Sequence, residues 1–170
     1  MKKKILYTIL ALLVIIQFFR PEKNLSDESL FDVHQGYYIP ANINLILQKA
    51  CNDCHTNKTR YPWYSDIQPA AWWMANHVKE GKGHLNLSEF TKRKIAYQNH
   101  KLEEFIDEVK EKEMPLPSYT WLGLHADANL SDAERTAIMD WAQKQMDSLK
   151  RTYPPDSLVL KRRQPPPAAN

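Results

Sequence analysis

The residues with the clearest capacity for chemistry are Cys51, Cys54 and His55, in the stretch Cys51-Asn52-Asp53-Cys54-His55. They include both cysteines of the chain, and a disulfide between the two would close a loop too small to stabilise a fold. Two thiols about one helical turn apart, followed at once by an imidazole, match the attachment pattern of c-type haem. In that pattern the thiols anchor one porphyrin edge and the histidine donates a nitrogen to iron. The sequence therefore predicts one covalent haem c.

Two other chemistries use the same residue types. A redox-active dithiol is expected near a βαβ pattern, whereas here a predicted helix precedes the motif and no strand is evident. A structural zinc ion would need two further ligands. The histidines that could supply them do not fall at zinc-finger spacing: His77, His84, His100 and His125. Haem attachment is therefore favoured over both.

The second axial ligand decides what such a haem can do, because a saturated iron transfers electrons whereas an open site can bind a gas or activate peroxide. Met114 is the first candidate, since Pro115 and Pro117 stop a helix here and leave it in an extended loop. The alternative for Met114 is a methionine that fills the core. His77 and His84, near the end of a predicted helix, are the rival ligands. Three other methionines are expected to pack on helices: Met74, Met139 and Met146.

The elements that must position these residues are predicted to be helices. Gly is scarce, at 4 residues, and Pro is plentiful, at 11, which favours helices joined by proline-containing loops over short strands. Apolar spacing and capping residues, among them a capping box at Ser131 and Glu134, indicate helices over residues 43–50, 70–80, 88–94, 102–112 and 131–149. Gly81 is expected to end the second of these. Residues 102, 105, 106 and 109 form one buried face of the fourth helix, and residues 138, 141, 142, 145 and 149 form one face of the fifth. We therefore expect an all-α domain over residues 41–150.

Both ends of the chain differ from this central part. Residues 2–4 are lysines, and fifteen mostly apolar residues follow before Arg20. We expect residues 1–20 to form a membrane-anchor helix, because no small residues suited to signal cleavage follow; a removed signal peptide is the alternative. The positive-inside rule then leaves the domain outside the cytoplasm, on the periplasmic side of an inner membrane. Residues 21–40 are expected to be a tether, and residues 151–170 a Pro-rich, basic and disordered tail.

The formal net charge of +3 arises at these ends, where residues 2–4, 20, 23, 151 and 161–163 are basic. Within residues 41–150 no basic face is interleaved with aromatic side chains. Nucleic acid is therefore not an expected partner.

The central part also resembles a known family. From about residue 41 to 150, the sequence is similar to the haem-binding domain family common in Bacteroidetes-type bacteria. The matching stretches are ACNDCHTNKT at 50–59, PWYS at 62–65, EMP at 113–115 and LSDAE at 130–134. The resemblance implies a small cytochrome c-like helical domain with Cys51 and Cys54 as attachment points and His55 as axial ligand. The chain departs from the expected pattern at residues 81–87 and 114–117.

These observations together predict an electron carrier rather than an enzyme. It would exchange single electrons with redox proteins of the periplasm or inner membrane, with a thioether ligand raising its reduction potential. Aromatic side chains are expected to keep water from the haem: Trp63, Tyr64, Trp72 and Trp73. The alternative function is a haem-based sensor or a peroxidase-like enzyme with an open distal site.

Overall fold

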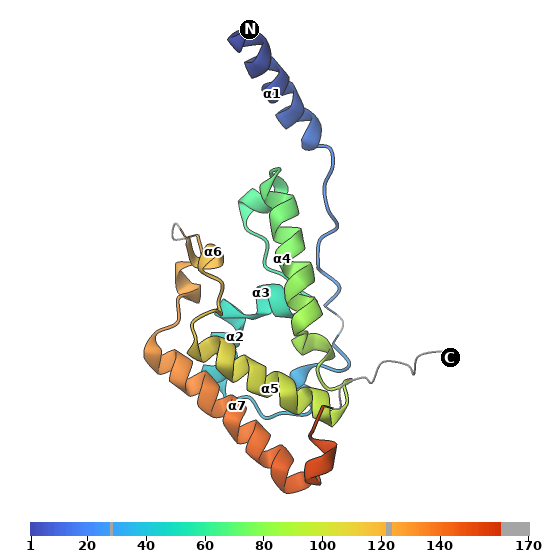
Figure 1. Ribbon diagram of the computed structural model, residues 1–170, viewed down its shortest axis with the longest axis vertical. Helices are drawn as coiled ribbons and strands as arrows, with labels where there is room; N and C mark the ends of the chain where they lie inside the picture. Colours follow the sequence, from blue (N-terminus) through green and yellow to red (C-terminus); the bar gives the residue numbers. More distant parts are fainter. Residues whose placement is uncertain (28, 122–123, 161–170) are drawn as a thin grey trace, which may run out of the picture.

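The structure is a computed structural model that describes residues 1–27, 29–121 and 124–160. Every regular element within these residues is a helix. Within these ranges, extended backbone pairs only in an isolated antiparallel bridge between Leu25 and Lys58. The prediction of an all-α fold is confirmed. In Figure 1, α1 (Lys2–Ile16) projects from one end, and the remaining helices form the body.

The body contains both long and short helices. The long ones are α2 (Ala41–Ala50), α4 (Ala70–His84), α5 (Ile95–Lys110) and α7 (Asp132–Thr152). The short ones are α3 (Asn52–His55) and α6 (Pro117–Thr120). Single turns of 3-10 helix lie between or beyond them: η1 (Val33–Gln35), η2 (Trp63–Asp66), η3 (Leu87–Glu89), η5 (Ala126–Ala128) and η6 (Pro155–Ser157).

The helix boundaries that differ most from the sequence-based expectation are the end of α4 and the start of α5. α4 continues through Gly81 to His84, and the Leu85 N–H closes its last turn on the Gly81 carbonyl at 2.9 Å. α5 begins at Ile95, earlier than predicted. The helix expected at residues 88–94 does not form, and only the turn η3 overlaps its first residues. Both helices are therefore longer than expected, although α5 ends at Lys110, two residues before its predicted end. Tertiary contacts stabilise the added turns, whose apolar periodicity is weak.

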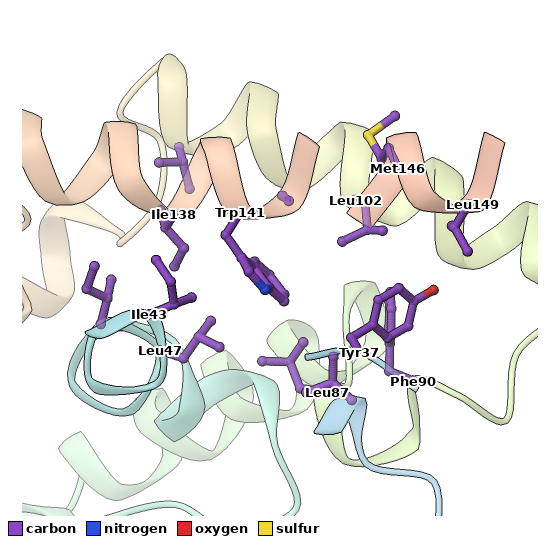
Figure 2. Packing of buried hydrophobic residues seen from close by; sticks show 14 of the residues in the cluster. Tyr37, Ile43, Leu47, Leu87, Phe90, Leu102, Ile138, Trp141, Met146 and Leu149 are labelled. Atoms are coloured by element: carbon purple, nitrogen blue, oxygen red, sulfur yellow. The ribbon is translucent and has the colours of Figure 1, made fainter. Parts of the chain in front are cut away.

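The core forms where α7 packs on α5 and α2. The capping box predicted at the start of α7 is present: the Ser131 side chain accepts from the Glu134 N–H, and the Glu134 side chain accepts from the Ser131 N–H. Figure 2 shows Ile138 and Trp141 of α7 directed toward α2. The buried face of α7 has the spacing of one helix face: Ile138, Trp141, Ala142, Met146 and Leu149.

Residues 21–40, expected to be a tether, pack against the body instead. Val33 and Tyr37 are buried in the core. The Tyr37 hydroxyl donates to Gln98 Oε1 of α5 at 2.5 Å, and the Asn24 side-chain amide donates to the Thr56 carbonyl at 2.8 Å. This segment is therefore part of the folded unit.

The chain after α7 also packs on the core. Leu158 follows η6 and is only 8% exposed, and its carbonyl accepts from the Asn99 side chain of α5 at 3.4 Å. The expectation of a disordered tail is wrong for residues 151–160, because Leu158 belongs to the core and lies beside the first turns of α5. The rest of the predicted tail, residues 161–170, lies outside the described residues.

α1 stands apart from this core. It has 15 residues, none of them buried. Gln17 connects α1 to the body: its side chain accepts from the Gln68 N–H at 2.9 Å and donates to the Gln68 carbonyl at 3.2 Å. Among the described helices, none is both long enough and apolar enough to cross a membrane. The predicted anchor segment is thus a helix, but a transmembrane helix is not found.

Candidate haem-binding site

The motif at residues 51–55 forms a single helical turn. α2 ends at Ala50, and Cys51 leaves the helix with φ −123° and ψ −44°. The Cys51 carbonyl then accepts from the backbone N–H groups of Cys54, at 3.2 Å, and His55, at 3.0 Å. The two thiols and the imidazole therefore belong to one short, hydrogen-bonded element, as their spacing predicts.

These three residues line a single cavity of about 550 Å³. A cavity of roughly 300–1,000 Å³ with mostly apolar walls is typical of small-molecule and cofactor sites. α2, α4, α5, α7 and the segments following α4, α5 and η5 contribute to the lining. The apolar part consists of Ala50, Leu85, Phe105, Val109, Leu116, Leu130 and Ile138. Two thiols, one imidazole and apolar walls form a donor set and an enclosure that fit a haem.

His55 is held in the form that binds a metal. Its Nδ1 lies 3.0 Å from the Leu85 carbonyl oxygen. Because a carbonyl can only accept, Nδ1 carries the proton and Nε2 keeps a free lone pair. Burial lowers the pKa of His55, against hydrogen bonds to the Leu85 and Gly81 backbone that raise it. The neutral imidazole is therefore favoured, with Nε2 available as the iron ligand.

Gly81 allows α4 to lie directly against the attachment motif. A Cβ at this position would stand 2.7 Å from the Cys54 carbonyl oxygen and 3.0 Å from the Cys54 Cβ. Contacts that short do not occur without displacement of the backbone. Gly81 was expected to end α4. In the structure the helix continues through it, and its role is to permit this close approach.

The environment of the two thiols does not favour dithiol exchange. Burial, with a smaller contribution from Cys54, raises the pKa of the Cys51 thiol to about 12. Burial, with the nearby charge of Asp53, raises the pKa of the Cys54 thiol to about 11. Redox-active CxxC motifs depend on a lowered pKa of the thiol.

The zinc alternative gains no support either, because the described residues contain no cluster of three or more His, Cys, Asp or Glu side chains that could hold a metal ion.

All three candidates for the distal ligand, Met114, His77 and His84, line the same cavity. The backbone of Met114 is fixed on both sides: its N–H donates to the Glu108 carbonyl at 3.2 Å, and its carbonyl accepts from Arg135 Nη1 at 2.8 Å. His77 has other partners, since its Nδ1 bonds to the Trp73 carbonyl at 2.9 Å and its ring packs 4.2 Å from the Trp73 ring. As in His55, a bond from Nδ1 to a carbonyl leaves Nε2 of His77 free, so Met114, His77 and His84 all remain candidates for the distal ligand.

The aromatic residues expected to shield the haem lie elsewhere. Trp63, Tyr64, Trp72 and Trp73 do not line the cavity, and Trp63 is 77% exposed. α5 supplies apolar side chains to the cavity lining instead, among them Phe105 and Val109. The helical spacing of these two residues already indicated that they belong to a buried face. Part of this face of α5 packs on α7, and part of it lines the cavity. Apolar periodicity shows that the face is buried, but it does not show which residues line the cavity.

Sequence reasoning also missed Asp53, which lies between the two cysteines and is only 6% exposed. Its carboxylate accepts from the Arg60 N–H at 2.9 Å, from Arg60 Nε at 3.2 Å and from Arg60 Nη2 at 3.1 Å. The Tyr119 hydroxyl donates to it at 2.7 Å. An Asp at a variable position of the motif carries no pattern that would single it out, because its partners come from elsewhere in the chain.

The fold and the site together define an all-helical domain with a largely apolar cavity lined by two thiols and an imidazole. Residues 11–144 match the haem-binding domain family, and the chain belongs to this family. No curated protein and no solved structure gives a significant match. Family membership supports the prediction that haem is the ligand.

Proposed function

We propose that this domain carries one haem c, attached through Cys51 and Cys54, with His55 as the proximal ligand. One observation carries the proposal: both thiols and His55 lie on one turn that lines one largely apolar cavity. Haem bound there supplies a one-electron redox couple. The Leu85 carbonyl orients the His55 ring, and Gly81 lets α4 lie against the attachment turn.

We further propose that Met114 is the distal ligand and that the domain transfers single electrons. The support is that Met114 lines the cavity on a loop whose backbone is held by α5 and by Arg135 of α7. A thioether favours reduced iron and so raises the potential. If His55 and Met114 both bound the iron, no open position would remain on it, and electron transfer would be favoured over catalysis.

The proposed partners are redox proteins at a membrane, with the domain on the periplasmic side of the inner membrane. The support comes from α1, a helix of apolar residues that are exposed to solvent, with Lys2, Lys3 and Lys4 at its start. An apolar helix without a protein partner is expected to associate with lipid, and leading lysines favour the cytoplasmic side. α1 is proposed here only as an attachment to the membrane.

Mass spectrometry tests the covalent haem directly. The full chain, exported in cells that have haem-attachment machinery, should gain the mass of one haem, and changing both Cys51→Ser and Cys54→Ser should abolish the gain. The haem stain should survive denaturing electrophoresis. An unmodified mass would contradict the proposal, and bound zinc would favour the metal alternative. Reduced protein that binds carbon monoxide readily would instead support a sensor or peroxidase-like function.

A further inference from the structure

A partly buried hydrogen bond joins the turn of residues 51–55 to the segment that follows Met114. α6 begins three residues after Met114, at Pro117. The hydroxyl of Tyr119 in α6 donates to Asp53 Oδ2 at 2.7 Å. Asp53 is two residues before His55 in the chain, so one carboxylate connects the element of the proximal ligand with the segment of the proposed distal ligand.

Asp53 is well placed to hold this bond. Arg60 donates to its carboxylate from the backbone and from the guanidinium, which compensates the buried charge. The hydrogen bond to Asp53 is the main cause that raises the pKa of Arg60. Burial, and then the bond to Asp53, raise the pKa of Tyr119. Tyr119 is therefore a protonated donor to a charged acceptor, which is the stronger class of hydrogen bond.

The ring of Tyr119 is fixed as well. It stacks on His125 with centroids 4.1 Å apart and an interplanar angle of 10°. His125 Nε2 lies 2.8 Å from the Tyr64 hydroxyl of η2. α6 is thus held from two sides, by the attachment turn and by η2.

We propose that the hydrogen bond between Asp53 and Tyr119 keeps the Met114 loop closed over the haem, which makes Asp53 and Tyr119 positioning residues for distal ligation. The inference rests on the proposed function. Arg135 holds the loop at Met114, and Asp53 holds it through Tyr119. With both attachments intact, Met114 stays at the cavity. Loss of the second attachment lets the loop open, so that small ligands compete with Met114 for iron.

Imidazole binding to the oxidised haem of the full-length protein tests this inference. Tyr119→Phe removes the hydroxyl and keeps the ring that stacks on His125. Because a hydrogen bond to a charged group is lost, imidazole should bind about tenfold faster. The absorption of the sulfur–iron bond should weaken while the haem stays attached. Asp53→Asn, which keeps the size of the side chain and loses the charge, should act in the same direction and serves if Tyr119→Phe does not fold.

The matched control is Tyr61→Phe. It also deletes a hydroxyl, whose oxygen accepts from the Asn24 N–H at 2.8 Å, but Tyr61 does not line the haem cavity. This variant should keep the wild-type rate of imidazole binding even if it is less stable. Equal acceleration in both tyrosine variants would overturn the inference, because it would indicate general loosening.

Met114→Ala distinguishes a failure of the positioning role of Asp53 and Tyr119 from a failure of the assignment of Met114 as distal ligand. If it changes the spectrum while Tyr119→Phe binds imidazole at the wild-type rate, the positioning role is wrong and the proposed function stands. If Met114→Ala leaves the spectrum unchanged, Met114 is not the ligand, and both the distal assignment and the positioning role fail.

Discussion

At the scale of single residues, the site depends on the close approach of α4 to the turn of residues 51–55 as well as on the residues that would bind haem. Gly81→Ala should lower the free energy of unfolding by about 1–3 kcal/mol, because its Cβ would meet the Cys54 carbonyl oxygen at 2.7 Å. Urea unfolding of the full chain measures the change. The same contact should reduce the yield of attached haem, since the attachment turn would be displaced.

Gly83→Ala is the control for this prediction. It lies in the same helix and nothing stands within 4 Å of its Cβ position. Alanine is a better helix former than glycine, so this variant should be neutral or more stable by up to about 1 kcal/mol. Equal destabilisation at positions 81 and 83 would show that helix propensity, and not the contact with Cys54, governs Gly81.

At the scale of elements, the proposed role of Met114 makes the segment from α5 to α6 responsible for the chemistry of the iron. Met114→Ala should leave the haem attached, abolish the sulfur-to-iron absorption at the red end of the oxidised spectrum and lower the reduction potential, because the thioether that favours reduced iron is lost. Optical spectra and a redox titration of the purified holoprotein measure these changes.

His77→Ala and His84→Ala provide the comparison, since both histidines line the same cavity. Neither should alter the spectrum or the potential in the way that Met114→Ala does. If one of them changes both while Met114→Ala changes neither, the axial pair is two histidines, and the electron carrier would work at a lower potential.

At the scale of the whole molecule, the chain ends contribute to the fold. Leu158→Ala should lower the free energy of unfolding by about 2–4 kcal/mol, because Leu158 is only 8% exposed and belongs to the core. Leu160→Ala, at a position that is 48% exposed, should change it by less than about 0.5 kcal/mol. Similar small effects at both positions would mean that the segment after α7 does not pack stably in solution.

The N-terminal helix is proposed to attach the domain to a membrane. If α1 attaches the protein to a membrane, the full chain should remain with the membrane fraction after a carbonate wash, and its intact N-terminus should be found by mass spectrometry. Recovery of a soluble protein starting near Leu25 would identify residues 1–20 as a removed signal peptide instead. The haem proposal would be unaffected, because α1 does not line the haem cavity.

The sequence alone determined the features that depend on neighbouring residues. The spacing of Cys51, Cys54 and His55 within one turn, the capping box at Ser131 and the buried face of α7 are local, since hydrogen bonds and periodicity within a helix fix them. For the same reason, the all-α fold and the single turn that carries Cys51, Cys54 and His55 could be predicted without the tertiary structure.

Only the tertiary structure decided how these elements meet. It brought Tyr119 to Asp53 and Gly81 to Cys54, placed Leu158 in the core and left Trp63 exposed. These contacts join residues far apart in the chain, and the sequence pattern of either partner fits several arrangements. Which arrangement forms depends on how the apolar faces of α2, α5 and α7 fill one volume, and that is a property of the packed chain as a whole.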